Sequence, residues 1–368
     1  MSMPAEHMIQ APTVADLLQG YVDAPRVPVQ GIASDSRLLR EGFLFLAVQG
    51  MSSHGLNFLG QAKEAGVCAV AWDASTGSEP ADIGVPMIAV DGLAAKLGEI
   101  ANRFYGRPSE HLDVIGVTGT NGKTTVAWMI AQAGELLDER CAYLGTLGYG
   151  VGSVEGAEGM TTPAAIELHG RLADFVDQGA KHAAIEVSSH ALSQGRVDGV
   201  RFDSALFTNL TRDHLDYHRD MREYFESKAR LFLDCGPRNR IINLDSEYGD
   251  QLAAKCGQDV VTVSTHFDRV ANGRPHVFVR SIVATDQGSD IRFVSSWGDG
   301  RFMLQLPGEF NVANAVLVLA LLLKKGVPLT TACDVMSQVS APPGRMQRVA
   351  MDLSLIHISE PTRLRLKS

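Results

Sequence analysis

The chain has 368 residues, of which 45% are hydrophobic and 20% are charged, and its formal net charge is -9 at pH 7. These values fit a globular protein of two or three domains. The excess of acidic residues argues against general nucleic-acid binding, because such binding needs a basic surface.

The sequence carries no signal for export or membrane insertion. Residues 1–20 lack the basic start and apolar core of a secretory signal. The most apolar run, residues 314–323, is far shorter than the roughly 20 residues that cross a bilayer, so we expect a buried helix there. The five cysteines show no metal-ligand or CxxC spacing. We therefore expect a reduced, cytoplasmic protein with no nucleic-acid partner and no membrane insertion.

Residues 1–107 are predicted to form a small N-terminal α/β domain. The apolar runs GFLFLAVQG (residues 42–50) and GVCAVAWD (66–73) predict strands, and NFLGQAKEAG (57–66) predicts a helix between them. Residues 102–110 contain Gly106 and Pro108 and are predicted to form a linker.

Residues 108–345 are predicted to form a central α/β domain. The run HLDVIGVTG (111–119) predicts a strand that leads into a glycine-rich loop and a helix. Helix-like segments separate several of the next apolar runs, which predicts parallel strands of a doubly wound sheet at residues 182–189, 204–210, 240–245 and 259–264. Closely spaced runs then predict an antiparallel subsheet at residues 276–284, 291–298 and 301–308, followed by a helix at 310–326.

Residues 346–368 are expected to hold the truncated start of a further domain and a non-native tail. The last 15 residues, SLIHISEPTRLRLKS, contain no clear element.

The stretch GVTGTNGKTT (116–125) resembles a phosphate-binding loop but departs from the strict template, because Val117 stands where the first glycine belongs. Backbone amides from Gly119 to Lys123 are expected to converge on the β- and γ-phosphates at a helix N-terminus. The side chain of Lys123 adds a positive charge, and the Thr124 hydroxyl is a candidate Mg²⁺ ligand. The alternative is a plain glycine turn, but the flanking strand and helix favour a nucleotide site.

Two further strand ends carry polar residues. Glu186 ends an apolar strand, where an unpaired carboxylate is costly, so either a metal ion or an ion pair with Arg or Lys is expected beside it. Asp213, His214, Asp216 and His218 follow the next strand, at the edge of an α/β sheet where ligands gather. Lys228 lies in a helix-like run and by itself predicts only a solvated charge.

Together these motifs resemble the Mur ligases, the ATP-dependent amide-forming enzymes of peptidoglycan synthesis, and among them the branch that adds the third peptide residue. The resemblance extends to about Leu353 and rests on DSR (35–37), LFLAVQG (44–50), HGLNF (54–58), TGTNGKTT (118–125), TTP (161–163), EVSSHALSQGRV (186–197), FTNLTRDHLDYH (207–218), GEFNVANA (308–315) and GRM (344–346).

The resemblance implies a role for each matching residue. Uridine diphosphate contacts would come from Ser34, Ser36, Ser52 and Ser53. Contacts to the muramoyl-peptide part would come from Thr161, Thr162, Ser188, Gln194 and Arg196. ATP would be bound by Gly119, Thr120, Asn121, Gly122, Lys123, Thr124, Thr125, Asn311 and Arg345. Mg²⁺ would be held by Thr124, Glu186, His214 and a carbamylated Lys228, and the catalytic set would be Lys123, Glu186, His214 and Lys228.

The implied fold is a uridine-binding α/β domain joined to a P-loop ATPase-type domain, with the family's third, Rossmann-like domain absent. The implied substrates are ATP, UDP-N-acetylmuramoyl-L-alanyl-D-glutamate and a diamino acid, expected to be meso-diaminopimelate, with lysine as the alternative. Because the family continues past GRM, we also expect a fragment that binds the precursor and turns it over poorly, or not at all. A folylpolyglutamate synthetase is disfavoured, because it generally lacks the uridine domain, and EVSSH and TTP point away from it.

Overall fold

The computed structural model describes residues 11–50, 53–77, 80–156, 160–213, 216–269, 271–351 and 354–359. The chain divides into two compact units. Unit 1 comprises Met1–Leu112, Pro163–Gly179 and Ser193–Val200, and unit 2 comprises Asp113–Thr162, Ala180–Leu192 and Arg201–Ser368.

Unit 1 contains a four-stranded parallel sheet. Its strands follow chain order: β1 (Gly31–Ala33), β2 (Phe43–Ala47), β3 (Ala69–Asp73) and β4 (Met87–Val90). Its helices are α1 (Val14–Leu18), α2 (Leu59–Ala65), α3 (Leu97–Phe104) and α5 (Ala165–Asp177). The predicted α/β character of this region is confirmed.

Alternation along β2 explains why both faces of this sheet are covered. Leu44 and Leu46 belong to the apolar cluster shared with α1 and α3, whereas Phe45 and Ala47 belong to the cluster shared with α2. Successive strand residues point to opposite faces, so a fully apolar strand needs a helix on each side. The predicted linker begins too early, because α3 continues to Phe104 and buries that ring.

Unit 2 is built on a ten-stranded sheet with the order β14-β13-β12-β11-β10-β9-β5-β8-β6-β7. The seven strands from β12 to β6 in this order run parallel to one another. The strands at the two ends, β7 on one side and β13 and β14 on the other, pair antiparallel with their neighbours. The strands are β5 (Asp113–Thr118), β6 (Cys141–Gly145), β7 (Gly148–Val151), β8 (His182–Glu186), β9 (Phe202–Phe207), β10 (Asn239–Asn243), β11 (Val261–Ser264), β12 (His276–Thr285), β13 (Gly288–Ser295) and β14 (Gly300–Leu304). The predicted parallel sheet with an antiparallel subsheet is confirmed.

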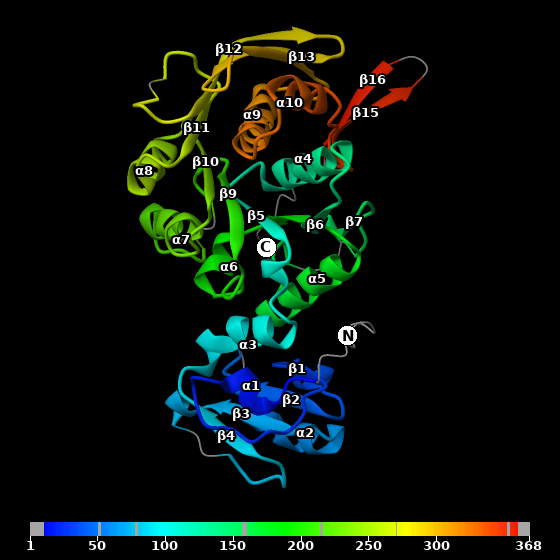
Figure 1. Cartoon of the computed structure of the whole chain (residues 1–368), viewed down its shortest axis with the longest axis vertical. Helices are drawn as coiled ribbons and strands as arrows, with labels where there is room; N and C mark the ends of the chain where they lie inside the picture. Colours follow the sequence, from blue (N-terminus) through cyan, green and yellow to red (C-terminus); the bar gives the residue numbers. More distant parts are fainter. Residues whose placement is uncertain are drawn as a thin grey trace, which may run out of the picture. The chain divides into compact units, whose positions relative to one another are not determined.

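Helices cover both faces of this sheet, with α4, α9 and α10 on one face and α7 and α8 on the other (Figure 1). The helices of this unit are α4 (Lys123–Leu136), α6 (Ser189–Ser193), α7 (Met221–Leu233), α8 (Glu247–Cys256), α9 (Glu309–Lys324) and α10 (Leu329–Met336). The run predicted to be a buried helix is the centre of α9, and its residues are buried all round. Such uniform burial suits a helix packed between a sheet and other helices.

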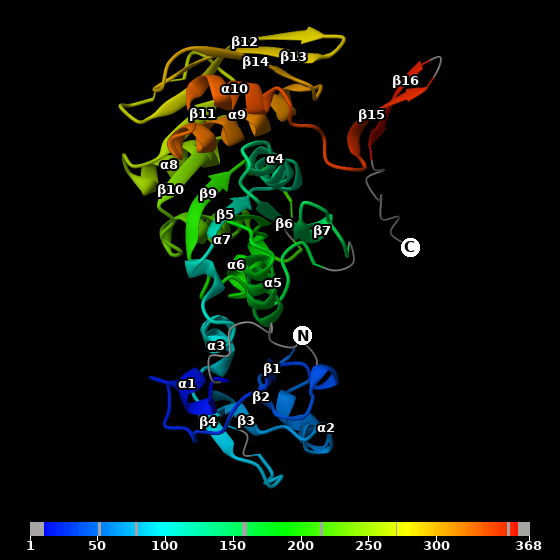
Figure 2. The ribbon, with the colours of Figure 1, turned by 45° about the vertical axis from the view of Figure 1, so that its right-hand side comes forward.

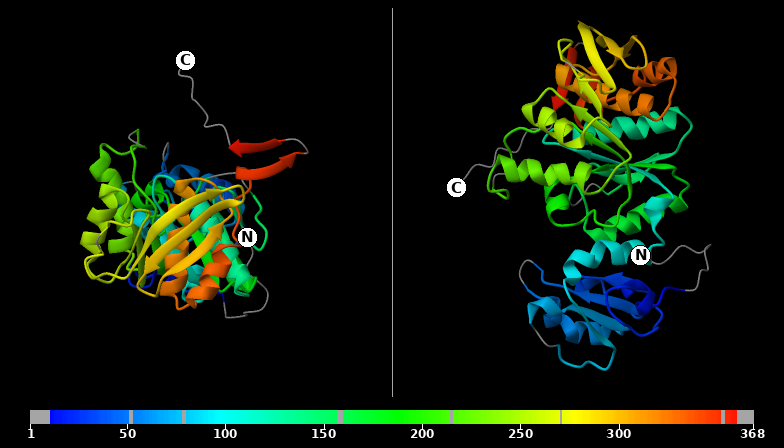
Figure 3. Two further views of the ribbon diagram at one scale, coloured as in Figure 1. Left: turned by 90° about the horizontal axis from the view of Figure 1, so that it is seen from above. Right: turned by 60° about the vertical axis from the view of Figure 1, so that its left-hand side comes forward.

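The antiparallel extension β12–β14 packs beside α9 and α10 (Figures 2 and 3). Its strands alternate buried and exposed residues at several positions, as expected where one face is solvated. None of the helices in the described ranges combines the length and the apolar character that crossing a bilayer requires.

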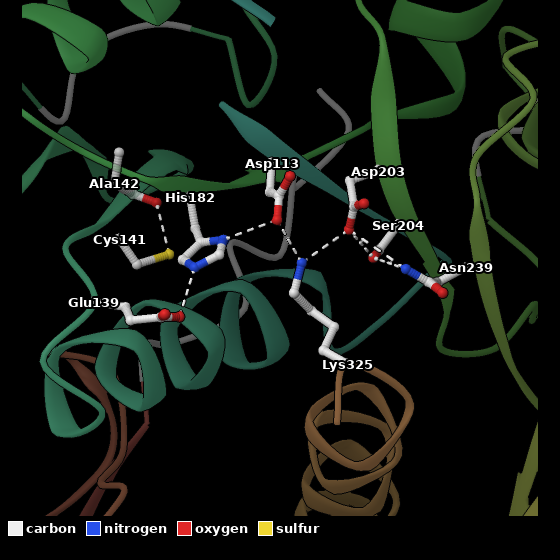
Figure 4. Close-up of polar contacts among 9 residues, drawn as sticks. All are labelled: Asp113, Glu139, Cys141, Ala142, His182, Asp203, Ser204, Asn239 and Lys325. Carbon is white, nitrogen blue, oxygen red and sulfur yellow. Dashed lines mark hydrogen bonds and ion pairs between the residues drawn. The ribbon is translucent and has the colours of Figure 1, made fainter. Parts of the chain in front are cut away.

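The amino ends of five neighbouring strands carry a chain of polar contacts (Figure 4). The ammonium of Lys325 lies 2.7 Å from Asp113 Oδ2 and 3.0 Å from Asp203 Oδ2. The ring of His182 lies 2.8 Å from Glu139 through Nε2 and 3.5 Å from Asp113 through Nδ1. This network lies at the edge of the sheet formed by the amino ends of the strands. The glycine-rich loop lies at the other edge, where β5 ends.

The end of the chain differs from the prediction. Ser354–Ser359, predicted to contain no clear element, forms β16 and pairs antiparallel with β15 (Arg345–Met351) in a separate two-stranded sheet. Apolar and polar residues alternate from Ile356 to Ser359, and that short pattern is a strand signal.

Candidate functional site

The glycine-rich loop connects β5 to α4, as the motif requires. Gly119 has φ 148°, and a Cβ atom there would lie 1.9 Å from the hydroxyl oxygen of Thr208. The Thr208 hydroxyl in turn donates a 2.6 Å hydrogen bond to the carbonyl of Asn121. Only glycine fits at position 119, because the loop closes directly over the end of β9.

Not all backbone amides of the loop are available for a phosphate. The Thr120 amide donates to the carbonyl of Asn209, and the Asn121 amide donates to the Asn209 side-chain oxygen at 3.1 Å. By contrast, the first amides of α4, at Lys123, Thr124 and Thr125, have no partner within the helix. These amides are the better candidates for holding an anion, because they lie at the helix N-terminus, the positive end of the helix dipole.

The side chain of Lys123 is folded back onto its own loop. Its ammonium donates hydrogen bonds to the carbonyls of Gly119 at 3.0 Å and Thr120 at 2.9 Å. A phosphate is a stronger partner for an ammonium than a neutral carbonyl. The loop therefore carries a cation beside the first turn of α4.

Glu186 ends β8 and is completely buried, with 0% exposure. Its carboxylate accepts hydrogen bonds from the hydroxyls of Thr124, Tyr143 and Thr146 at 3.0, 2.6 and 3.2 Å, and from the Thr146 amide at 2.9 Å. All of these donors are neutral, so the ion pair with Arg or Lys that was one expectation does not occur among the described residues. A buried carboxylate with neutral partners only is a fitting ligand for a cation.

Lys228 lies on α7 and is 1% exposed, so the solvated charge predicted from its helical position alone is wrong. Its Nζ lies 2.9 Å from the carbonyl of Gly119 and 4.6 Å from the centre of the Tyr224 ring. Burial lowers the pKa of Lys228 well below its ordinary value, and the nearby charge of Lys123 lowers that pKa further, against an opposing effect of Asp213. A lowered pKa makes the neutral, nucleophilic form of the amine easier to reach.

His214 falls outside the described residues, as does Ser52. Among the other polar residues of that stretch, His218 is buried and lies 3.0 Å from the Ser189 hydroxyl through Nε2. Its ring also packs against those of Tyr217 and Tyr224. His218 is therefore a structural hydrogen-bonding residue.

The threonines of the TTP motif lie close to the end of β8. Thr162 is buried, donates to the Glu186 carbonyl at 2.8 Å and accepts from the Ser188 amide at 3.1 Å. The hydroxyl of Thr161 lies 3.3 Å from that of Thr146. The structure thus brings three of the expected substrate residues, Thr161, Thr162 and Ser188, next to the candidate cation ligand.

Unit 1 holds the other expected substrate residues, Ser34, Ser36, Ser53, Gln194 and Arg196. Gln194 accepts a 2.9 Å hydrogen bond from Arg196, so these two side chains are oriented together. Asp35 accepts hydrogen bonds from the amide and the guanidinium of Arg37. These bonds stabilise the turn at residues 35–37, which includes Ser36 and directly follows Ser34.

The remaining ATP-binding candidates are placed differently. Asn311 is buried in the first turn of α9 and donates a 2.7 Å hydrogen bond to the Pro307 carbonyl. Arg345 begins β15, of which only the backbone is described.

The contacts of Tyr143, Thr146 and Asn209 were not anticipated from the sequence. Tyr143 lies in β6 and Thr146 lies in the turn between β6 and β7, in a segment that comes before the TTP motif. That segment is a hairpin, in which β6 and β7 pair directly.

Comparison with known families decides what this arrangement is. The model of the Mur ligase middle domain matches residues 117–322, and that of the Mur ligase family catalytic domain matches residues 28–105. The chain belongs to the Mur ligase family. The first match contains the glycine-rich loop from Val117 on, Glu186 and Lys228.

Individual Mur ligases are also similar to this chain. A Pseudomonas aeruginosa protein named UDP-N-acetylmuramoyl-L-alanyl-D-glutamate--2,6-diaminopimelate ligase is 42% identical over 87% of this chain and 65% of its own length. A Xanthomonas campestris protein of the same name is 39% identical over 93% of this chain and 68% of its own. A solved structure of an enzyme of that name superposes with a TM-score of 0.80 at 28% identity, covering 94% of this chain and 70% of that one. The chain thus spans about two thirds of the length of these relatives.

Proposed function

We propose that this Mur ligase joins UDP-N-acetylmuramoyl-L-alanyl-D-glutamate to meso-diaminopimelate through an amide bond, at the expense of ATP. The names of its relatives support the two substrates. The observation that carries the proposal is the hydrogen bond between Thr124, at the head of the loop helix, and the buried carboxylate of Glu186. It joins a phosphate-binding element to a candidate cation ligand.

The residues at this site fit a nucleotide with Mg²⁺. Thr124 and Glu186 would hold the cation, together with His214 and a carbamylated Lys228 as the family resemblance implies. A bound Mg²⁺ would supply positive charge that offsets the charge of the transferring phosphoryl group. The first amides of α4 and the Lys123 ammonium would hold the phosphates, with Asn311 and Arg345 at the nucleotide end.

The reaction needs an activated carboxyl group, because a carboxylate is a poor acyl donor. The γ-phosphoryl group of ATP would pass to the D-glutamyl side-chain carboxylate, giving ADP and an acyl phosphate. An amino group of diaminopimelate would then attack the carbonyl carbon, the C–O bond to phosphate would break, and the amine would lose a proton. Lys123 would leave the carbonyls of Gly119 and Thr120 for the phosphate, where it stabilises charge in the transition state.

We also propose that Lys228 becomes carbamylated. Its neutral amine would attack CO₂, forming an N–C bond and releasing one proton. Burial favours this chemistry because it lowers the pKa of the Lys228 ammonium. Carbon-13 NMR with labelled bicarbonate should show one carbamate signal that is missing from Lys228→Met, and a signal that persists in the variant would contradict this assignment.

The family resemblance also implies the residues that would contact the precursor. The uridine diphosphate end would contact Ser34, Ser36, Ser52 and Ser53, and the peptide end would contact Thr161, Thr162, Ser188, Gln194 and Arg196. The proposed location is the cytoplasm, since ATP is available there and all five cysteines are free thiols.

The test is calorimetric titration of the protein with the precursor and with ATP, followed by mass spectrometry of the products. We expect both ligands to bind and any product that forms to carry diaminopimelate. A product formed equally well with lysine would refute the amino-acid assignment. Failure to bind either ligand would refute the proposed function as a whole.

A further inference from the structure

The two carboxylate oxygens of Glu186 have different surroundings. Oε1 accepts hydrogen bonds from the Tyr143 hydroxyl at 2.6 Å and from the Thr146 amide at 2.9 Å. Oε2 accepts hydrogen bonds only from hydroxyls, those of Thr124 at 3.0 Å and Thr146 at 3.2 Å. A carboxylate oxygen has two lone-pair sites, so each oxygen is saturated in this structure.

The partners of Oε1 cannot easily give way. The Thr146 amide is part of the main chain that follows β6. The Tyr143 ring is 1% exposed and packs edge-on against Trp128 at 5.7 Å between ring centres. A Cβ atom at Gly145 would lie 2.2 Å from Oε1, so the backbone also closes over this oxygen.

The partners of Oε2 are free to change roles. A hydroxyl group can rotate and offer its oxygen lone pairs instead of its hydrogen. When a cation approaches Oε2, the Thr124 hydroxyl can therefore become a second ligand at no steric cost. Oε1 lacks this freedom, because the Thr146 amide always donates to one of its lone-pair sites and the Tyr143 hydroxyl, carried by a buried and packed ring, occupies the other.

We propose that Tyr143 is a positioning residue that makes Glu186 a one-oxygen ligand through Oε2 and so favours Mg²⁺ over Ca²⁺. The inference rests on the proposed cation site. Mg²⁺ requires near-octahedral geometry, with one oxygen per ligand position. Ca²⁺ accepts both oxygens of a carboxylate at longer distances. Holding Oε1 away from the cation removes the arrangement that suits the larger ion.

Tyr143→Phe tests this assignment, because it removes the hydroxyl and keeps the ring. Mg²⁺ and Ca²⁺ affinities are measured without nucleotide by competition against Mn²⁺, whose free-ion EPR signal reports binding. We expect the Mg²⁺ affinity to fall about 10-fold, as is typical when a partner of a metal ligand is lost. We expect Ca²⁺ affinity to change less than about threefold. The variant leaves the Thr146 amide on Oε1 but frees the lone-pair site that the Tyr143 hydroxyl occupied, and Ca²⁺, which accepts both oxygens of a carboxylate, can use that site.

Tyr149→Phe is the matched control, since Tyr149 lies on the paired strand β7 with its ring near Gly156. It should leave both affinities unchanged. Equal losses of both affinities in Tyr143→Phe would mean general damage and would overturn the inference, as would no change at all. A wild-type protein that binds no Mn²⁺ would instead overturn the cation site itself, and this inference with it.

A second measurement needs no variant. Infrared difference spectra of the wild-type protein, with glutamate carboxyl carbons labelled, report whether a carboxylate binds a cation through one oxygen or two. We expect the one-oxygen pattern with Mg²⁺. A two-oxygen pattern with Mg²⁺ would overturn the assignment of Tyr143 even if the variant does not fold.

Discussion

The hydroxyl of Thr124 lies 3.0 Å from Oε2 of Glu186, which joins the second residue of α4 to the last residue of β8. The two residues are 62 positions apart in the sequence and meet because β5 and β8 are neighbouring parallel strands. The carboxyl ends of β5 and β8 lie at the same edge of the sheet, where ligands of α/β proteins bind.

Glu186→Gln should abolish the dependence of nucleotide binding on Mg²⁺. The amide keeps the shape of the side chain but removes the negative charge that would attract the cation. We expect phosphate release to fall about 100- to 1,000-fold, the scale seen when one charge-stabilising group is lost. Glu247→Gln, an exposed residue at the start of α8, should have no effect. Equal Mg²⁺ dependence in the wild type and Glu186→Gln would count against the site.

Gly119→Ala should displace the loop, because the added Cβ atom meets the Thr208 hydroxyl at 1.9 Å. We expect ATP affinity to fall at least 10-fold and the free energy of unfolding to fall by about 1–3 kcal/mol, the usual cost of forcing an alanine into a strained site. Calorimetry and urea unfolding measure the two effects. Gly152→Ala separates contact from backbone strain, since Gly152 has φ 74° but no atom near its Cβ position. Similar loss of ATP affinity in both variants would contradict the steric argument.

Lys228→Met should stabilise the protein at pH 7 in buffer free of CO₂. The folded-state pKa of Lys228 lies below its unfolded value of about 10.4. Between these two values the unfolded chain binds a proton that the folded chain does not, so stability rises with pH across this range. Methionine removes this cost, and each kcal/mol gained raises Tm by about 2–4 °C.

The advantage of Lys228→Met should shrink as the pH approaches about 10.4, where the unfolded chain also loses the proton. Thermal unfolding from pH 7 to 10.5 measures the trend. Lys255→Met, an exposed position on α8, is the control and should show no such trend. A variant advantage that grew with pH would show that Lys228 is charged in the folded protein.

Lys325→Met should destabilise unit 2 by about 1–3 kcal/mol, because hydrogen bonds to charged groups are lost and two carboxylates remain near each other. Burial alone would lower the pKa of Lys325, but its hydrogen bonds to Asp113 and Asp203 raise it above its ordinary value. This stabilisation is therefore present at neutral pH and is lost above about pH 10.4. Lys324→Met is the neighbouring control, since Lys324 lies 3.5 Å from Asp259, a largely exposed carboxylate, and such pairs contribute little.

The effect of Lys325→Met should also shrink in acid. Burial would raise the pKa of Asp203, but the hydrogen bonds it accepts, including one from Lys325, lower it. The pair thus stabilises the fold above about pH 4 and loses its effect as Asp203 takes up a proton. Urea unfolding at pH 7 and pH 3 should give a smaller difference at pH 3, and an equal difference would contradict the role of Asp203.

Much of the fold could be predicted because its signals are local. The buried centre of α9 reads as an uninterrupted apolar run, and the order of apolar strands and helix-like segments predicts the parallel sheet. The strand β16 could not be predicted with the same ease, because only Ile356 to Ser359 alternate and its pairing with β15 is not local to that segment.

The site was only partly predictable, since its central contacts join distant residues. The sequence pointed to Glu186 as a costly carboxylate, but the identity of its partners depends on β6 lying beside β8. Lys228 shows the same limit: helical spacing says where a side chain points, not whether another segment covers it. Its side chain is buried, and its Nζ contacts the loop carbonyl of Gly119, 109 residues away.

The most direct test of the proposed reaction follows one oxygen atom. The precursor is prepared with oxygen-18 in the side-chain carboxylate of its D-glutamyl residue and is incubated with ATP, Mg²⁺ and meso-diaminopimelate. The proposal predicts that each phosphate released carries one oxygen-18 atom, because the acyl phosphate breaks between carbon and oxygen. Amide product accompanied by unlabelled phosphate would contradict the account.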